Sequence, residues 1–176
     1  MSRGEEVNLQ VKWNTHKVFV GDICYALDDD LYRRVWGDKL GFKDGEVENY
    51  ALVASTEYGD GCYDSQSGTV YGVDAGVIGV TDIEHFKDKE NSVEDLERLG
   101  AVVDIPSGHA EIHFISDTDG TFYITINDGT SGDTLFSDVI WTGSDDEDED
   151  EDDWDDEDDE DDLDFWADND DGEDED

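Results

Sequence analysis

Hydrophobic and polar residues alternate at the start of the chain. Val7, Leu9, Val11 and Trp13 occupy every second position, which is the pattern of a β-strand that buries one face. Short apolar or alternating runs between glycine-rich turns predict further strands. These runs cover residues 17–20, 50–56, 69–73, 76–81, 101–105, 109–115, 121–126 and 134–142, and the segment Asp117-Thr118-Asp119-Gly120 is typical of a hairpin turn.

The segment 28–40 has helical features instead. It begins with three aspartates, which the positive end of a helix dipole favours. Leu31, Val35 and Trp36 then fall on one face of the expected helix. Gly37 and Gly41 lower the helical propensity in and just after the second half, so the sequence does not define where this helix ends.

A second helix is expected from Ser92 to Leu99. Ser92 is a preferred N-cap, and Asp95 stands at the position that completes a capping box. Gly100 follows as the expected C′ residue that stops the helix. Many short strands with two short helices predict an α+β fold, built on a mainly antiparallel β-sheet or a small barrel.

Charge divides the chain into two parts. The protein has 53 acidic and 10 basic residues, and 25 of the acidic ones lie in the last 32 positions, which contain no Lys, Arg or His. Such a segment repels itself and has little to bury, so residues 145–176 are predicted to be a disordered tail. Residues 1–144 carry the other 28 acidic residues and are long enough for a globular β-rich domain without metals or disulfides.

This charge excludes several classes of function. Direct nucleic-acid binding through a basic patch needs cations that the chain does not offer. Binding to an anionic membrane is disfavoured for the same reason, and no apolar run approaches a transmembrane length. The first residues lack the apolar core of a signal peptide. With only two cysteines, a reduced, cytoplasmic protein is expected.

Two segments repeat the pattern Gly-Asp-x-Cys-Tyr, at residues 21–25 and 59–63. If the two turns lay together, Asp22, Cys24, Asp60 and Cys62 could form a polar cluster or a metal site. Their spacing matches no recognised zinc motif. The alternative is that each cysteine acts as a small buried hydrophobe and each tyrosine packs on the core.

A second candidate metal site is His109, Glu111 and His113, which share one face if their segment is a strand. The alternative is that they form the solvent face opposite the apolar positions. The chain has no nucleophile-elbow, phosphate-loop or zinc-protease motif. We therefore expect a protein that is not an enzyme and has no cofactor, and that the two candidate sites hold no metal.

The segments Val20–Leu27, Tyr58–Tyr63 and Val73–Val80 resemble a family of small uncharacterised bacterial and phage proteins. Members of that family carry similar Gly-Asp-x-Cys-Tyr, Tyr-Gly-Asp-Gly-x-Tyr and Val-Asp-x-Gly-x-Ile-Gly-Val segments. The resemblance covers roughly residues 18–81. It implies a β-rich domain of microbial or viral origin and no particular activity. If the protein is phage-encoded, its compartment is the cytoplasm of the host cell.

The tail has the charge spacing of a nucleic acid. Extended at about 3.3 Å per residue it would span roughly 105 Å, or about 4 Å for each acidic group, against about 3.4 Å per phosphate in a DNA strand. Aromatic and aliphatic residues interrupt it and could anchor in a partner's apolar pockets, unless they are incidental in a low-complexity run. The expected partner-binding residues are Trp154, Asp155, Asp156, Leu163, Asp164, Phe165 and Trp166.

These features favour an acidic decoy, which occupies the nucleic-acid site of a basic nucleic-acid-binding protein and inhibits it. A phage could use such a protein against a host defence. One alternative is a chaperone or carrier of basic proteins. Others are adaptation to high salt, or an enzyme or metal protein built on the Cys, Asp and His candidates. The oligomeric state cannot be inferred from the sequence.

Overall fold

The computed structural model describes residues 6–36, 45–47, 50–88 and 90–143. Contacts divide the chain into two units, Met1–Ser144 and Asp145–Asp176. The predicted disorder of residues 145–176 and the end of the first predicted helix lie outside the described residues.

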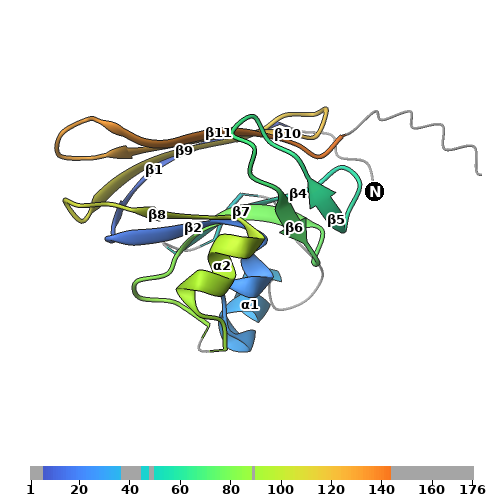
Figure 1. The fold of residues 1–176 in the computed structure, drawn as a ribbon, viewed down its shortest axis with the longest axis horizontal. Coiled ribbons are helices and arrows are strands. Elements are labelled where there is room, and N and C mark those ends of the chain that lie inside the picture. Colours follow the sequence, from blue (N-terminus) through green and yellow to red (C-terminus); the bar gives the residue numbers. More distant parts are fainter. Residues whose placement is uncertain (1–5, 37–44, 48–49, 89, 144–176) are drawn as a thin grey trace, which may run out of the picture. The chain divides into compact units, whose positions relative to one another are not determined.

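The first unit contains strands, two α-helices and one 3-10 turn within its described part (Figure 1). In chain order these are β1 (Val7–Asn14), β2 (Lys17–Gly21), η1 (Ile23–Tyr25), α1 (Asp29–Trp36), β3 (Gly45–Val47), β4 (Ala51–Ser55), β5 (Gly61–Tyr63), β6 (Tyr71–Val73), β7 (Val77–Asp82), α2 (Val93–Leu99), β8 (Ala101–Asp104), β9 (His109–Ser116), β10 (Thr121–Asp128) and β11 (Thr134–Trp141).

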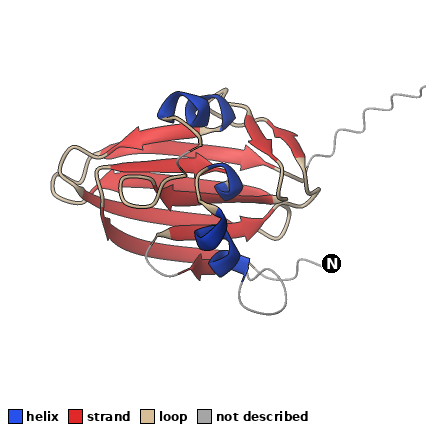
Figure 2. Ribbon diagram, turned by 90° about the horizontal axis from the view of Figure 1, so that it is seen from below, coloured by secondary structure: helices blue, strands red, loops and turns tan. Residues whose placement is uncertain are grey.

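The strands form two main antiparallel sheets. A four-stranded sheet has the order β1-β9-β10-β11, and a five-stranded sheet has the order β3-β4-β7-β2-β8. The hairpin β5-β6 forms a third, small sheet. Figure 1 shows the two main sheets stacked face to face, and Figure 2 shows both helices lying across the other face of the five-stranded sheet. The predicted α+β class is confirmed.

The main core lies between the two sheets and follows the predicted alternation. On the four-stranded sheet Ile112, Phe114, Phe122 and Ile124 are fully buried, whereas their strand neighbours on the other face are not. The rings of Phe114 and Phe122 meet edge to face, with centroids 5.8 Å apart. Complete burial of one such side chain contributes about 1.5–3 kcal/mol, so this layer contributes several such increments to stability.

The five-stranded sheet is buried on both faces. Every residue of β7 is buried, and so are most residues of β2 and β4. Val80 belongs to the core between the two sheets. On the opposite face, Val53 and Val77 pack under α1, and Phe19 packs under α2 with Leu96. Burial on both faces explains why these strands have continuous apolar runs in the sequence rather than alternating ones.

Two glycines allow this close packing. A Cβ on Gly79, in β7, would lie 2.1 Å from the carbonyl oxygen of Leu52 in the neighbouring strand. A Cβ on Gly100 would lie 2.2 Å from the carbonyl oxygen of Val20. Gly100 ends α2 as predicted, and its N–H donates to the carbonyl of Leu96, but its φ of −176° is extended. It is required because the helix end touches β2.

The capping box of α2 is as predicted, whereas some of the short strands are not. The capping box is confirmed, because Ser92 accepts from the backbone of Asp95 and Asp95 accepts from the backbone of Ser92. The strand expected at residues 69–73 begins only at Tyr71. The sequence pattern did not predict β3 and β5, which have three residues each. A three-residue strand is too short to show a period.

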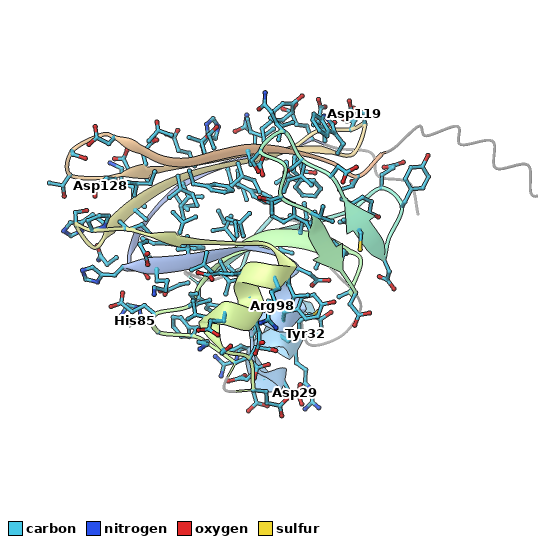
Figure 3. The ribbon with its side chains drawn as sticks, in the orientation of Figure 1. Asp29, Tyr32, His85, Arg98, Asp119 and Asp128 are labelled. Atoms are coloured by element: carbon cyan, nitrogen blue, oxygen red, sulfur yellow. The ribbon has the colours of Figure 1, made fainter. Side chains whose placement is uncertain are left out.

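The carboxylate of Asp128 organises the β10–β11 turn, at the end of the four-stranded sheet opposite Asp119 (Figure 3). It accepts hydrogen bonds from the backbone N–H groups of Thr130 at 2.8 Å and Ser131 at 3.0 Å. These bonds, with a contribution from Ser107, lower the pKa of Asp128 from 3.8 to about 2.

We expect Gly79→Ala to lower the free energy of unfolding by about 1–3 kcal/mol or more, because the added Cβ must push two strands apart. Urea denaturation would measure this loss. Gly72→Ala is the matched control, because that strand glycine has its nearest neighbour, Leu99 Cδ2, at 3.6 Å from the added Cβ. Its effect should stay within about 0.5 kcal/mol. Equal losses in the two variants would contradict the close-packing argument.

We expect Asp128→Asn to destabilise the protein at pH 6 and to have little effect near pH 2. A carboxyl group whose pKa is lowered in the folded state stabilises it above the unfolded pKa, and loses this effect as the pH falls through the folded pKa. The difference in melting temperature between wild type and Asp128→Asn should therefore shrink between pH 4 and pH 2. A constant difference over that range would contradict the assignment.

Candidate functional site

The two Gly-Asp-x-Cys-Tyr segments lie close together in the fold. Asp22 accepts hydrogen bonds from the backbone N–H groups of Asp74 and Ala75, and Gly76 follows these residues directly. A Cβ on Gly76 would lie 3.7 Å from Asp60 Oδ1. The segments nevertheless differ in structure, because the first forms η1 and the second forms β5. The sequence repeat is therefore not a structural repeat.

Asp22 is a buried structural carboxylate. It is fully buried and accepts three backbone hydrogen bonds, from Cys24 at 2.9 Å and from Asp74 and Ala75 at 2.7 Å each. Burial raises its pKa, and these hydrogen bonds oppose the rise. The carboxylate thereby ties η1 to the loop before β7. All its observed bonds serve the fold.

The two cysteines are in different environments. Cys24 is partly buried, and burial together with Asp22 raises the pKa of its thiol. Cys62 is exposed on β5. Across the described residues, no three His, Cys, Asp or Glu side chains are arranged to hold a metal ion. This geometry favours the alternative in which Cys24 serves packing.

His109, Glu111 and His113 share the outer face of the four-stranded sheet, as their spacing predicts. Each one contacts the neighbouring strand β1 rather than its companions. His109 Nδ1 lies 3.0 Å from Asn14 Oδ1, and His113 Nε2 lies 3.0 Å from Asn8 Oδ1. Glu111 forms an ion pair of 3.6 Å with Lys12. These contacts link β1 to β9 across the surface, and they favour the solvent-face alternative.

A cluster that no sequence pattern predicted joins the β1–β2 turn to the end of β7. The buried carboxylate of Asp82 accepts from Thr15 Oγ1 at 2.8 Å and lies 3.0 Å from His85 Nδ1. The bond to Asp82 raises the pKa of His85, which Figure 3 labels. Thr15 donates to the carboxylate and not to the imidazole, so the group does not have the order of a nucleophilic triad. Thr15 and Asp82 are 67 residues apart, and no local pattern signals the pair.

An acidic cleft lies beside the start of α1, in two adjoining hollows of about 570 and 540 Å³. Both hollows are lined by Asp29, Asp88 and Glu90. Figure 3 labels Asp29 and Tyr32 on this helix. The remaining lining residues are Cys24, Leu27, Asp28, Asp30, Tyr32, Arg33, Asp74, Ala75 and Asn91. Carboxylates outnumber the one described arginine, so the cleft attracts cations.

The expected partner-binding residues of the tail lie outside the described residues. These are Trp154, Asp155, Asp156, Leu163, Asp164, Phe165 and Trp166. Their role stays a prediction.

No family model, no curated protein and no solved structure matches this chain. The resemblance of residues 18–81 to bacterial and phage proteins therefore also stays a prediction. Within the described residues, no helix has the length and apolar character needed to cross a membrane.

We expect iodoacetamide to alkylate Cys62 at least about tenfold faster than Cys24 at pH 8, because the thiolate is the reactive form and burial suppresses it at Cys24. Mass spectrometry of the single variants Cys24→Ala and Cys62→Ala would give each rate separately. A Cys24 that reacts as fast as Cys62 would contradict its structural role and favour a nucleophile.

Proposed function

We propose that this protein is a non-enzymatic acidic decoy that occupies the nucleic-acid site of a basic nucleic-acid-binding protein and inhibits it. The proposal is carried by one observation, the 25 acidic residues among the last 32 positions. In a fully extended chain their spacing would approach that of the phosphates in one nucleic-acid strand. A cationic groove that tracks a phosphate backbone therefore offers complementary charge along the tail.

The acidic surface of the first unit also favours binding of a basic partner. The cleft beside α1 adds carboxylates that face solvent, among them Asp28, Asp30 and Asp88. An acidic surface of this kind raises the association rate with a basic protein by long-range attraction. The resemblance to phage proteins suggests a purpose, because a phage gains when host proteins that act on nucleic acid are blocked.

A chaperone or carrier of basic proteins would need the same acidic tail. The two functions differ in selectivity and in what the bound partner can still do. A decoy competes with nucleic acid for one site on few partners. A carrier binds many basic proteins and releases them.

We expect the tail to dominate capture of the partner. The full chain, the chain of residues 1–144, and a full-length variant with Asn and Gln for the tail's Asp and Glu would be immobilised and exposed to a nuclease-treated bacterial lysate. At about 0.1 M salt the full chain should retain one or a few basic nucleic-acid-binding proteins. Both altered chains should bind them at least about tenfold more weakly, because counterion release is lost.

Competition then distinguishes the alternatives. Added single-stranded or duplex DNA should displace the captured protein if the tail occupies a nucleic-acid site. A broad set of captured basic proteins that keep their nucleic-acid binding would favour the carrier. Equal capture by the 1–144 chain would contradict a function centred on the tail. Trp154→Ala, Phe165→Ala and Trp166→Ala leave the charge intact, so a loss that persists at high salt would identify these residues as anchors.

A further inference from the structure

The outer face of the four-stranded sheet carries an apolar group at its β9–β10 hairpin end. Strand pairing aligns Ile115 with Tyr123, and Tyr123 with Val139. Trp141 lies two residues beyond Val139 on the same face, opposite Thr121. We call Ile115, Tyr123, Val139 and Trp141 the aromatic patch. Its members alternate with residues that point into the core, so they lie on the other side of the sheet from the core.

The aromatic patch is accessible to a partner. Tyr123 is 41% exposed and Trp141 is 45% exposed, and both are among the most exposed large hydrophobic residues described. Ile115 and Val139 are partly exposed between them. Two aromatic side chains held side by side on a rigid sheet present flat surfaces at a low cost in conformational entropy. This arrangement is typical of an interaction surface.

The described charged residues around the aromatic patch are acidic. Asp117 and Asp119 belong to the hairpin turn, where the Asp117 N–H donates to the Thr121 carbonyl and Asp119 Oδ1 accepts from the Thr121 N–H. Asp64 lies beside the edge of β11, where its backbone carbonyl accepts a hydrogen bond from the Trp141 N–H. Glu6 precedes β1, next to the residue that pairs with Ser116. Figure 3 shows Asp119 at this end of the sheet.

Among the described residues, cations are remote from the aromatic patch. Lys12 is the nearest described one along the sheet, and it stands four residues from Asn8, the residue that pairs with Ile115. That separation is about 13 Å along a strand, and Lys12 is already paired with Glu111. The sequence has no Lys or Arg after Arg98. In the part of the chain that the structure describes, the patch therefore combines exposed rings with a border of acidic residues.

We propose that the aromatic patch binds an arginine-bearing segment of the basic partner. Guanidinium groups would stack on the rings of Tyr123 and Trp141, and neighbouring arginines would pair with the bordering aspartates. Arginine fits better than lysine because its planar group stacks on aromatic faces and is more weakly hydrated. A second copy of this chain is a poor occupant, because each chain carries a net charge of −43. The inference rests on the proposed function and assigns to the folded unit a selectivity that the tail's charge does not supply.

Binding of labelled octa-arginine and octa-lysine peptides to the full chain would test this. At about 0.5 M salt, where exposed charges are strongly screened, the wild-type chain should bind octa-arginine more tightly than octa-lysine. The double variant Tyr123→Ala, Trp141→Ala should weaken octa-arginine binding by about threefold to fivefold for each ring removed. Its binding of octa-lysine should change much less.

Two controls keep this result interpretable. Tyr123→Phe keeps the ring and removes the hydroxyl, so it should bind octa-arginine as the wild type does. Urea denaturation of the double variant checks that its fold is retained, and a single-ring variant, Trp141→Ala, replaces it if it is not. Unchanged octa-arginine binding in a folded ring-deleted variant would overturn the inference, and so would an equal loss for the two peptides.

The experiments distinguish failure of the proposed function from failure of the inference about the aromatic patch. If the charge-neutral tail variant loses the captured partner while the ring-deleted chain retains it with wild-type affinity, the tail function stands and the aromatic patch has no part in it. If the ring-deleted chain loses arginine selectivity while tail removal leaves capture unchanged, the patch stands and the tail-centred decoy falls.

Discussion

The fold buries four carboxylates in a chain that has few cations to neutralise them. Asp22, Asp82, Asp128 and Asp138 are each no more than 5% exposed. An unpaired carboxylate in a protein interior costs several kcal/mol. Here the partners are backbone N–H groups, hydroxyls and one histidine, and among the described residues none of the four pairs with Lys or Arg. Asp138, for example, accepts from the Ser67 N–H at 2.9 Å and the Tyr71 hydroxyl at 2.7 Å.

The hydrogen bonds to these buried carboxylates also hold the loops in place. Each of these carboxylates joins segments that are distant in the sequence, such as η1 with the loop before β7 through Asp22, or β11 with the loop before β6 through Asp138. The hydrogen bonds lower the pKa of Asp138 against the opposing effect of burial, which is the largest single contribution. Backbone amides thus replace cationic side chains, and acidic residues can be both structural inside and abundant outside.

The distribution of the cations connects the fold to the proposed function. All ten Lys and Arg residues lie at or before Arg98, so β9, β10 and β11 form a surface without them. The aromatic patch lies on those strands, and the acidic tail follows β11 in the sequence. The tail and the aromatic patch would contribute differently to the binding of one partner. The charge of the tail would attract the partner at long range, and the rings of the patch would discriminate between arginine and lysine at contact.

The sequence by itself determined the fold class, the capping box at Ser92, the strands around the hairpin turn and the charge of the whole molecule. These follow from local periodicity, local hydrogen bonds and composition. Only the tertiary structure decided that the two Gly-Asp-x-Cys-Tyr segments have different roles and that Gly100 is needed for close packing. It alone placed Tyr123 and Trp141 on one surface, because neighbours across a sheet are set by strand order and register, which no nearby residue in the sequence encodes.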